Sequence, residues 1–135
     1  MPEHKYILGD SRSMEEIPDE SVNLVVTSPP YWNLKDYDGG GDEIGQGDSS
    51  YQEYLAGLFG VFRECTRVLT PDGKIAINIM PIFLTGKATK FNRRVTKTVL
   101  SDLERFFEGL GNMFFLSLYI WDCLLYTSDA ADDSL

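Results

Sequence analysis

A run of apolar, mostly β-branched residues at 22–27 stops at two consecutive prolines, and this feature constrains the fold more than any other. The run predicts a buried strand. Because proline cannot donate to a sheet ladder, the strand has to end before Pro29. In an open α/β sheet, ligands and catalytic groups collect at the ends of strands. The turn at 28–32 offers a hydroxyl, carbonyl oxygens and two aromatic rings, which suits a planar substrate with an amino group on its edge.

The residues before this strand predict a second strand beside it. Residues 5–8 are predicted as a short strand that ends at Asp10. Residues 13–16 fit a capping box that opens a short helix, which Pro18 ends. Two strands joined through a helix form a parallel pair with both carboxyl ends at one edge. We therefore expect Asp10 to lie beside Ser28.

The residues after the proline turn predict further helices and strands. Ser50 and Glu53 form a capping box at the start of a helix over 51–69. Its apolar side chains recur at helical spacing and predict one core-facing stripe: Tyr51, Tyr54, Leu55, Leu58, Phe62, Cys65 and Leu69. This spacing indicates a helix packed on the sheet.

The second half of the chain continues the alternation of strands and helices. Residues 71–73 predict a turn, and alternating isoleucines predict a strand over 75–79. Residues 95–110 predict a helix that stops at glycines, and residues 113–121 predict a last apolar strand. Four strands with intervening helices predict a three-layer α/β sheet.

Charge and composition limit the classes of function. The net charge of −9 argues by itself against a nucleic-acid partner. A basic cluster nevertheless interrupts the acidic chain: Lys87, Lys90, Arg93, Arg94 and Lys97. It is interpreted either as a solvated loop or as a phosphate-binding surface. Two cysteines and one histidine predict no disulfide framework, no metal site and no histidine catalysis. No long apolar run or signal peptide is present, which predicts a cytoplasmic protein without membrane contact.

The sequence Thr-Ser-Pro-Pro-Tyr-Trp at 27–32 resembles the catalytic motif of S-adenosylmethionine-dependent DNA amino-methyltransferases, Asp/Asn/Ser-Pro-Pro-Tyr/Phe. The serine form is most similar to the cytosine-N4 enzymes, whereas adenine-N6 enzymes more often carry aspartate. The resemblance covers about residues 5 to 122 and includes the lead-in at 19–24 and the segment 67–74. It implies a partial Rossmann-like class I methyltransferase sheet, S-adenosylmethionine as cofactor, double-stranded DNA as substrate, and a cognate restriction endonuclease.

The resemblance also implies roles for the residues of the turn. Ser28 Oγ and the Pro29 carbonyl would accept hydrogen bonds from the amino group of a base. Pro30 would stiffen the turn. The base has to be flipped out of the duplex, and Tyr31 would stack on it while Trp32 extends the wall.

Further roles follow from the same resemblance. An acidic residue at the end of the preceding strand, here Asp10, would hold the adenosine part of the cofactor. Ordinary turn chemistry is the alternative interpretation of Asp10. The basic residues would contact DNA phosphates: Lys87, Lys90, Arg93 and Arg94.

The chain departs from the family pattern in two respects. It contains neither the glycine-rich loop that holds the methionine part of the cofactor nor a target-recognition region, which predicts a fragment that binds cofactor poorly or not at all and methylates nothing alone. Residues 1–122 are therefore predicted as a partial catalytic domain. Residues 123–135 show neither periodicity nor a cap and are predicted as a non-native or disordered tail. The alternative functions are an adenine-N6 DNA methyltransferase, a protein or RNA N-methyltransferase, and a non-catalytic nucleic-acid-binding remnant.

Overall fold

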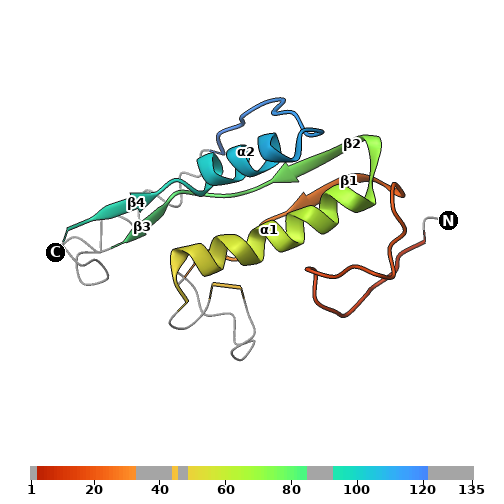
Figure 1. The fold of residues 1–135 in the computed structure, drawn as a ribbon, viewed down its shortest axis with the longest axis horizontal. Helices are drawn as coiled ribbons and strands as arrows, with labels where there is room; N and C mark the ends of the chain where they lie inside the picture. Colours follow the sequence, from red (N-terminus) through yellow and green to blue (C-terminus); the bar gives the residue numbers. More distant parts are fainter. Residues whose placement is uncertain (1–2, 33–43, 46–48, 85–92, 122–135) are drawn as a thin grey trace.

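The fold is built on a strand–helix–strand unit. The computed structural model describes residues 3–32, 44–45, 49–84 and 93–121. Strand β1 (Val22–Thr27) runs parallel to β2 (Leu69–Ile77), and helix α1 (Tyr51–Val68) lies between them in the chain (Figure 1). The amide of Asn78 donates to the carbonyl of Thr27 at 2.9 Å, which extends the pairing beyond β2. Both strands thus end at one edge of the sheet, where the proline turn begins.

Helix α1 begins at the predicted capping box. The amide of Glu53 donates to Ser50 Oγ at 3.2 Å, and the amide of Ser50 donates to Glu53 Oε2 at 2.6 Å. These bonds satisfy backbone donors that an uncapped helix leaves without partners. The predicted stripe is confirmed for Tyr51, Tyr54, Leu58, Phe62 and Cys65, which are buried on one face of α1 together with Val68. Leu55 is only half-buried, and Leu69 belongs to β2 instead of to the helix.

Strand β2 contains the predicted turn as a bulge. Leu69 pairs with Val22 and Lys74 with Leu24, so the chain at 71–73 protrudes from the ladder. A Cβ atom on Gly73 would lie 2.7 Å from Leu69 Cδ2, which is too close for any other residue without rearrangement. Beyond the bulge, half-buried isoleucines alternate with exposed residues along the strand, as predicted.

The prediction of one helix over 95–110 is wrong at its start. Strand β4 (Val95–Lys97) pairs antiparallel with β3 (Ile82–Leu84), and helix α2 (Val99–Leu110) begins only afterwards. The β-branched residues at the start of β4 favour a strand once a partner strand is available. Helix α2 ends at Gly111, whose φ of 75° is the left-handed conformation that favours glycine.

The predicted strands at 5–8 and 113–121 and the helix at 13–16 are also wrong, because these residues adopt no regular secondary structure. A strand requires a partner for its backbone groups, and none of the described segments pairs with either of the two predicted strands. The segment after residue 13 is instead fastened to α1. Arg67 donates to the carbonyls of Met14 and Ile17 at 2.9 and 3.1 Å, and Glu64 accepts from the amide of Met14 at 2.8 Å.

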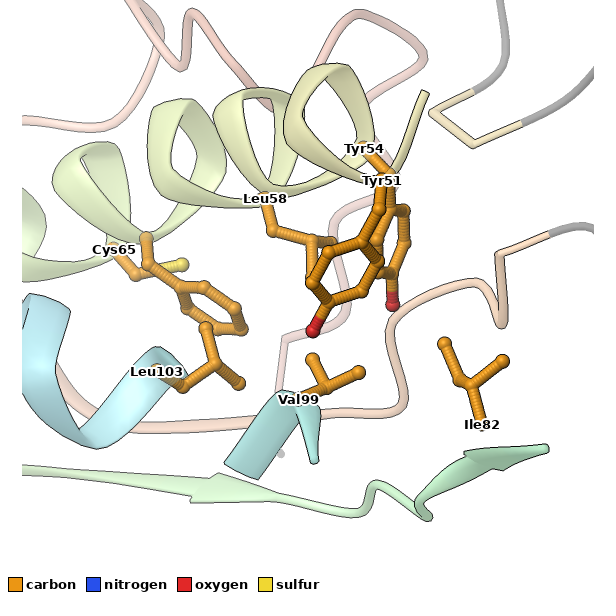
Figure 2. Close-up of a cluster of buried hydrophobic side chains, with 8 residues drawn as sticks. Tyr51, Tyr54, Leu58, Cys65, Ile82, Val99 and Leu103 are labelled. Carbon is orange, nitrogen blue, oxygen red and sulfur yellow. The ribbon is translucent and has the colours of Figure 1, made fainter. Parts of the chain in front are cut away.

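The core lies between α1, α2 and one face of the sheet. Figure 2 shows the side chains of α1 meeting those of Val99 and Leu103 from α2 and Ile82 from β3. On the opposite face of β1, Leu24 and Val26 are 56% and 73% exposed. The α/β class is confirmed, and the described residues form two of the three predicted layers. Neither described helix is both long enough and apolar enough to cross a membrane.

Candidate active site

The proline turn lies at the carboxyl end of β1, as predicted. Ser28 is exposed, Pro29 is buried, and Pro30 and Tyr31 are half-buried. The serine is therefore accessible to solvent, while the proline beside it packs into the protein. The structure keeps the predicted group together at the edge where the two parallel strands end, because its four residues are adjacent in the chain. They are Ser28, Pro29, Pro30 and Tyr31.

A buried tyrosine of α1 holds the turn. The hydroxyl of Tyr54 donates to the carbonyl of Pro30 at 2.9 Å, and the Tyr54 side chain is fully buried. Since prolines carry no N–H, the turn has few backbone donors with which to fix itself. Tyr54 supplies a donor from a neighbouring element. The rigid first turns of α1 thereby locate the Pro30 carbonyl.

Three aromatic rings, Trp32, Tyr51 and Tyr54, pack together behind the turn and are called the aromatic cluster below. The Trp32 ring centroid lies 5.3 Å from that of Tyr51 and 6.4 Å from that of Tyr54, which it meets in a stacked arrangement. Its indole N–H donates to the carbonyl of Ser49 at 3.0 Å. These contacts anchor Trp32 within the protein. Its predicted role as a wall for the base stays a prediction, and its contacts indicate support of the turn.

The aromatic cluster is linked to α2 and β4. The hydroxyl of Tyr51 donates to Asp102 Oδ2 at 2.6 Å, and Lys97 Nζ lies 4.8 Å from the centroid of the Tyr51 ring. Burial and then the Asp102 carboxylate raise the pKa of Tyr51 above its ordinary value, which favours the protonated hydroxyl that donates to Asp102. Figure 2 shows the Tyr51 and Tyr54 rings side by side, extending from the first turns of α1.

Asp10 forms an ion pair with Arg12, which the sequence analysis does not predict. Its carboxylate is exposed and bound by Arg12, whose Nε and Nη2 donate at 2.7 to 3.0 Å. The Arg12 side chain lies against Gly60 in α1, where an added Cβ would be 3.4 Å from Arg12 Cγ. Hydrogen bonds from the Arg12 side chain and amide lower the pKa of Asp10. The strand expected to carry Asp10 to the carboxyl edge does not form, and its cofactor-binding role stays a prediction.

The described basic residues lie at the β3–β4 pair, which Figure 1 shows beyond the carboxyl end of β2. Arg93 and Arg94 are exposed immediately before β4. Lys97 lies in β4 and contacts the aromatic cluster through Tyr51. Lys87 and Lys90 lie outside the described residues. Part of the basic cluster is thus continuous with the elements that support the turn.

Sequence reasoning missed the polar contacts of the two tyrosines and of Lys97. Their helical spacing predicts Tyr51 and Tyr54 in the apolar stripe, and the structure confirms this for their rings. A tyrosine buried in a core usually needs a hydrogen-bond partner for its hydroxyl. Two tyrosines three residues apart on the buried face of a helix start therefore indicate that each hydroxyl has a hydrogen-bond partner nearby.

Comparison with known proteins shows one consistent family. A family model described as DNA methylase, of the N6/N4 type, matches residues 22–132. The Type II methyltransferase M.SfiI of Streptomyces fimbriatus is 38% identical over 96 residues, which are 70% of this chain and 21% of that protein. The Type II methyltransferase M.SmaI of Serratia marcescens is 40% identical over 86 residues, which are 63% of this chain and 29% of that protein.

A solved structure shows the same fold. A Thermus thermophilus protein assigned as a DNA modification methylase, complexed with S-adenosyl-L-methionine, superposes with a TM-score of 0.58 and 32% identity. The match covers 77% of this chain and 39% of the other. This chain therefore spans well under half the length of the relatives to which it is similar.

Proposed function

This chain belongs to the N6/N4 DNA methylase family, and we propose that its proline turn holds the amino group of a flipped DNA base, preferentially cytosine N4, for methylation. The observation that carries the proposal is the exposed Ser28 next to the buried Pro29 at the carboxyl end of β1. The carbonyl that follows, on Pro30, is held by Tyr54 at 2.9 Å.

The chemistry requires two acceptors on one nitrogen. The lone pair of an exocyclic amino group is delocalised into the ring, so the nitrogen has to become more tetrahedral before it can attack a methyl carbon. Acceptors fixed on its two hydrogens favour that geometry and stabilise the positive charge that develops. Ser28 Oγ and the Pro29 carbonyl are adjacent acceptors on a turn whose φ angles are locked by proline rings.

The remaining residues of the turn fit a flipped base. An enzyme that modifies a base takes it out of the stack and holds it by stacking on an aromatic ring. Tyr31 follows the acceptors directly and would supply the ring face. Trp32, stacked on Tyr54, keeps the peptide after Tyr31 in place.

S-adenosylmethionine, the ligand in the Thermus structure, would supply the methyl group as an electrophilic carbon. The described residues fit the base better than they fit this cofactor. Asp10, the predicted contact for its adenosine part, is bound to Arg12 on the flank of α1. The role proposed for this chain is therefore to bind and orient the base.

DNA is the proposed substrate, and the basic residues are its proposed contacts. Arg93 and Arg94 are exposed at the β3–β4 pair, and Lys87 and Lys90 belong to the same stretch of sequence. Cations in such positions bind DNA phosphates without reading sequence. Because the relatives are Type II methyltransferases, we place the chain in a restriction–modification system.

The test is methyl transfer to DNA followed by identification of the product. The full-length gene product is incubated with S-adenosylmethionine that carries a labelled methyl group and with unmethylated duplex DNA, and the DNA is digested to nucleosides. We expect label in N4-methylcytosine.

Ser28→Ala should lower the rate about 100-fold, as loss of one preorganised partner of a transition state does. Ser11→Ala, at an exposed serine outside the turn, is the matched control and should keep the rate. Label in N6-methyladenine would refute the cytosine assignment, and label only in added protein or RNA would refute DNA as the substrate.

A further inference from the structure

We infer that Tyr54 is a positioning residue of the proline turn, acting through the Pro30 carbonyl to orient the Pro29 carbonyl toward the amino group of the base. The inference rests on the proposed function and deepens it. Tyr54 lies in the first turns of α1 and follows the turn by more than twenty residues in the sequence. Only the folded structure brings its hydroxyl to the turn.

The turn itself explains why an external donor matters. Proline rings lock φ at Pro29 and Pro30, which leaves ψ at these residues as the main freedom. The peptide that carries the Pro29 carbonyl lies between two anchors. On one side the Thr27 carbonyl accepts from the amide of Asn78 at 2.9 Å. On the other side the Pro30 carbonyl accepts from Tyr54 at the same distance. Without the second anchor, the Pro29 carbonyl could rotate away from the base.

Tyr54 is itself tightly packed. Its side chain is fully buried and stacks on Trp32. The backbone of Gly45 packs directly on the ring, because an added Cβ there would lie 2.7 Å from Tyr54 Cδ2. A hydroxyl on so constrained a ring holds its acceptor in one place, and preorganisation of this kind reduces the rearrangement needed at the moment of reaction.

Tyr51 provides a matched comparison within the same aromatic cluster. It is also buried, lies one helical turn earlier, and contacts Trp32 and Tyr54. Its hydroxyl, however, donates to Asp102 instead of to the proline turn. Tyr51→Phe and Tyr54→Phe therefore each remove one hydroxyl and keep the ring, and only Tyr54→Phe removes the contact to Pro30.

The first measurement isolates the Pro30 carbonyl in the folded chain. Of the six prolines, only Pro30 precedes a tyrosine. Labelling proline at its carbonyl carbon with ¹³C and tyrosine at its amide with ¹⁵N thus yields one carbonyl–amide NMR correlation. We expect Tyr54→Phe to move this carbonyl resonance upfield, as loss of a hydrogen bond does, and Tyr51→Phe to leave it in place. An unshifted resonance in Tyr54→Phe would overturn the inference.

The second measurement is methyl transfer by the full-length gene product that carries each of the same two variants. Loss of one positioning hydrogen bond should lower kcat about tenfold and leave the KM for DNA unchanged. Tyr51→Phe should keep kcat. If Tyr54 had only a structural role, Tyr54→Phe would lower the stability of the protein. It would not lower kcat selectively while KM stayed unchanged. A shifted carbonyl with unchanged kcat would overturn the positioning role. A full-length wild-type protein without methyl transfer would refute the proposed function, while the carbonyl resonance would still decide whether Tyr54 orients the turn.

Discussion

Replacing Gly45 by alanine should disturb the residues that support the proline turn. Gly45 is buried and has a φ of 83°, in the left-handed region. An added Cβ would lie 2.7 Å from Tyr54 Cδ2 and 3.3 Å from the Cα of Trp32. The methyl group therefore meets both a strained backbone and a packed ring.

The magnitude follows from these two costs. A non-glycine residue in the left-handed conformation costs about 1–2 kcal/mol. Inserting a methyl group into packed side chains costs about 1–3 kcal/mol more. Tyr54 cannot simply turn aside, because its hydroxyl is bonded to the Pro30 carbonyl and its ring stacks on Trp32. We expect Gly45→Ala to lower the free energy of unfolding by about 2–5 kcal/mol.

The assay is urea unfolding followed by circular dichroism, with Gly109→Ala as the matched control. Gly109 lies in α2 with nothing within 4 Å of an added Cβ, so alanine there should be neutral or stabilising by up to about 1 kcal/mol. A change of less than about 0.5 kcal/mol in Gly45→Ala, which is typical of an unconstrained surface position, would refute this reasoning.

Three further predictions concern other parts of the molecule. Hydrogen bonds from Arg67 hold the pKa of Glu64 at about 2 instead of 4.5, so this pair stabilises the fold fully above pH 4.5 and progressively less as the pH falls towards 2. Glu64→Gln should flatten the dependence of the melting temperature on pH in that window, and an unchanged profile would contradict the assignment. Ser50→Ala removes the capping box of α1 and should lower the free energy of unfolding by about 1 kcal/mol in urea titrations, whereas no loss would contradict the cap. Arg93→Ala and Arg94→Ala should each reduce the slope of log binding constant against log salt for duplex DNA by about 0.9, and unchanged slopes would argue against phosphate contacts.

The elements predicted correctly have signals within their own residues. The strand at 22–27 is marked by β-branched residues and a proline stop, and α1 by a capping box and a stripe at helical spacing. The proline turn follows from the same local rules, and the structure places it at the carboxyl end of β1. Local propensity and hydrogen bonding close in sequence decide such features, so they can be inferred before any tertiary contact is known.

The errors concern elements whose identity depends on a distant partner. Residues 113–121 are as apolar as a strand, but no described segment pairs with them, and Val95–Lys97 forms a strand because β3 lies beside it. The contacts of the candidate site also depend on partners that are distant in the sequence. The sequence alone determined which side chains form the turn, while only the tertiary structure decided that Tyr54 anchors it and that Asp10 pairs with Arg12. Backbone pairing and buried hydrogen bonds join residues far apart in the chain, and no local pattern specifies such partners.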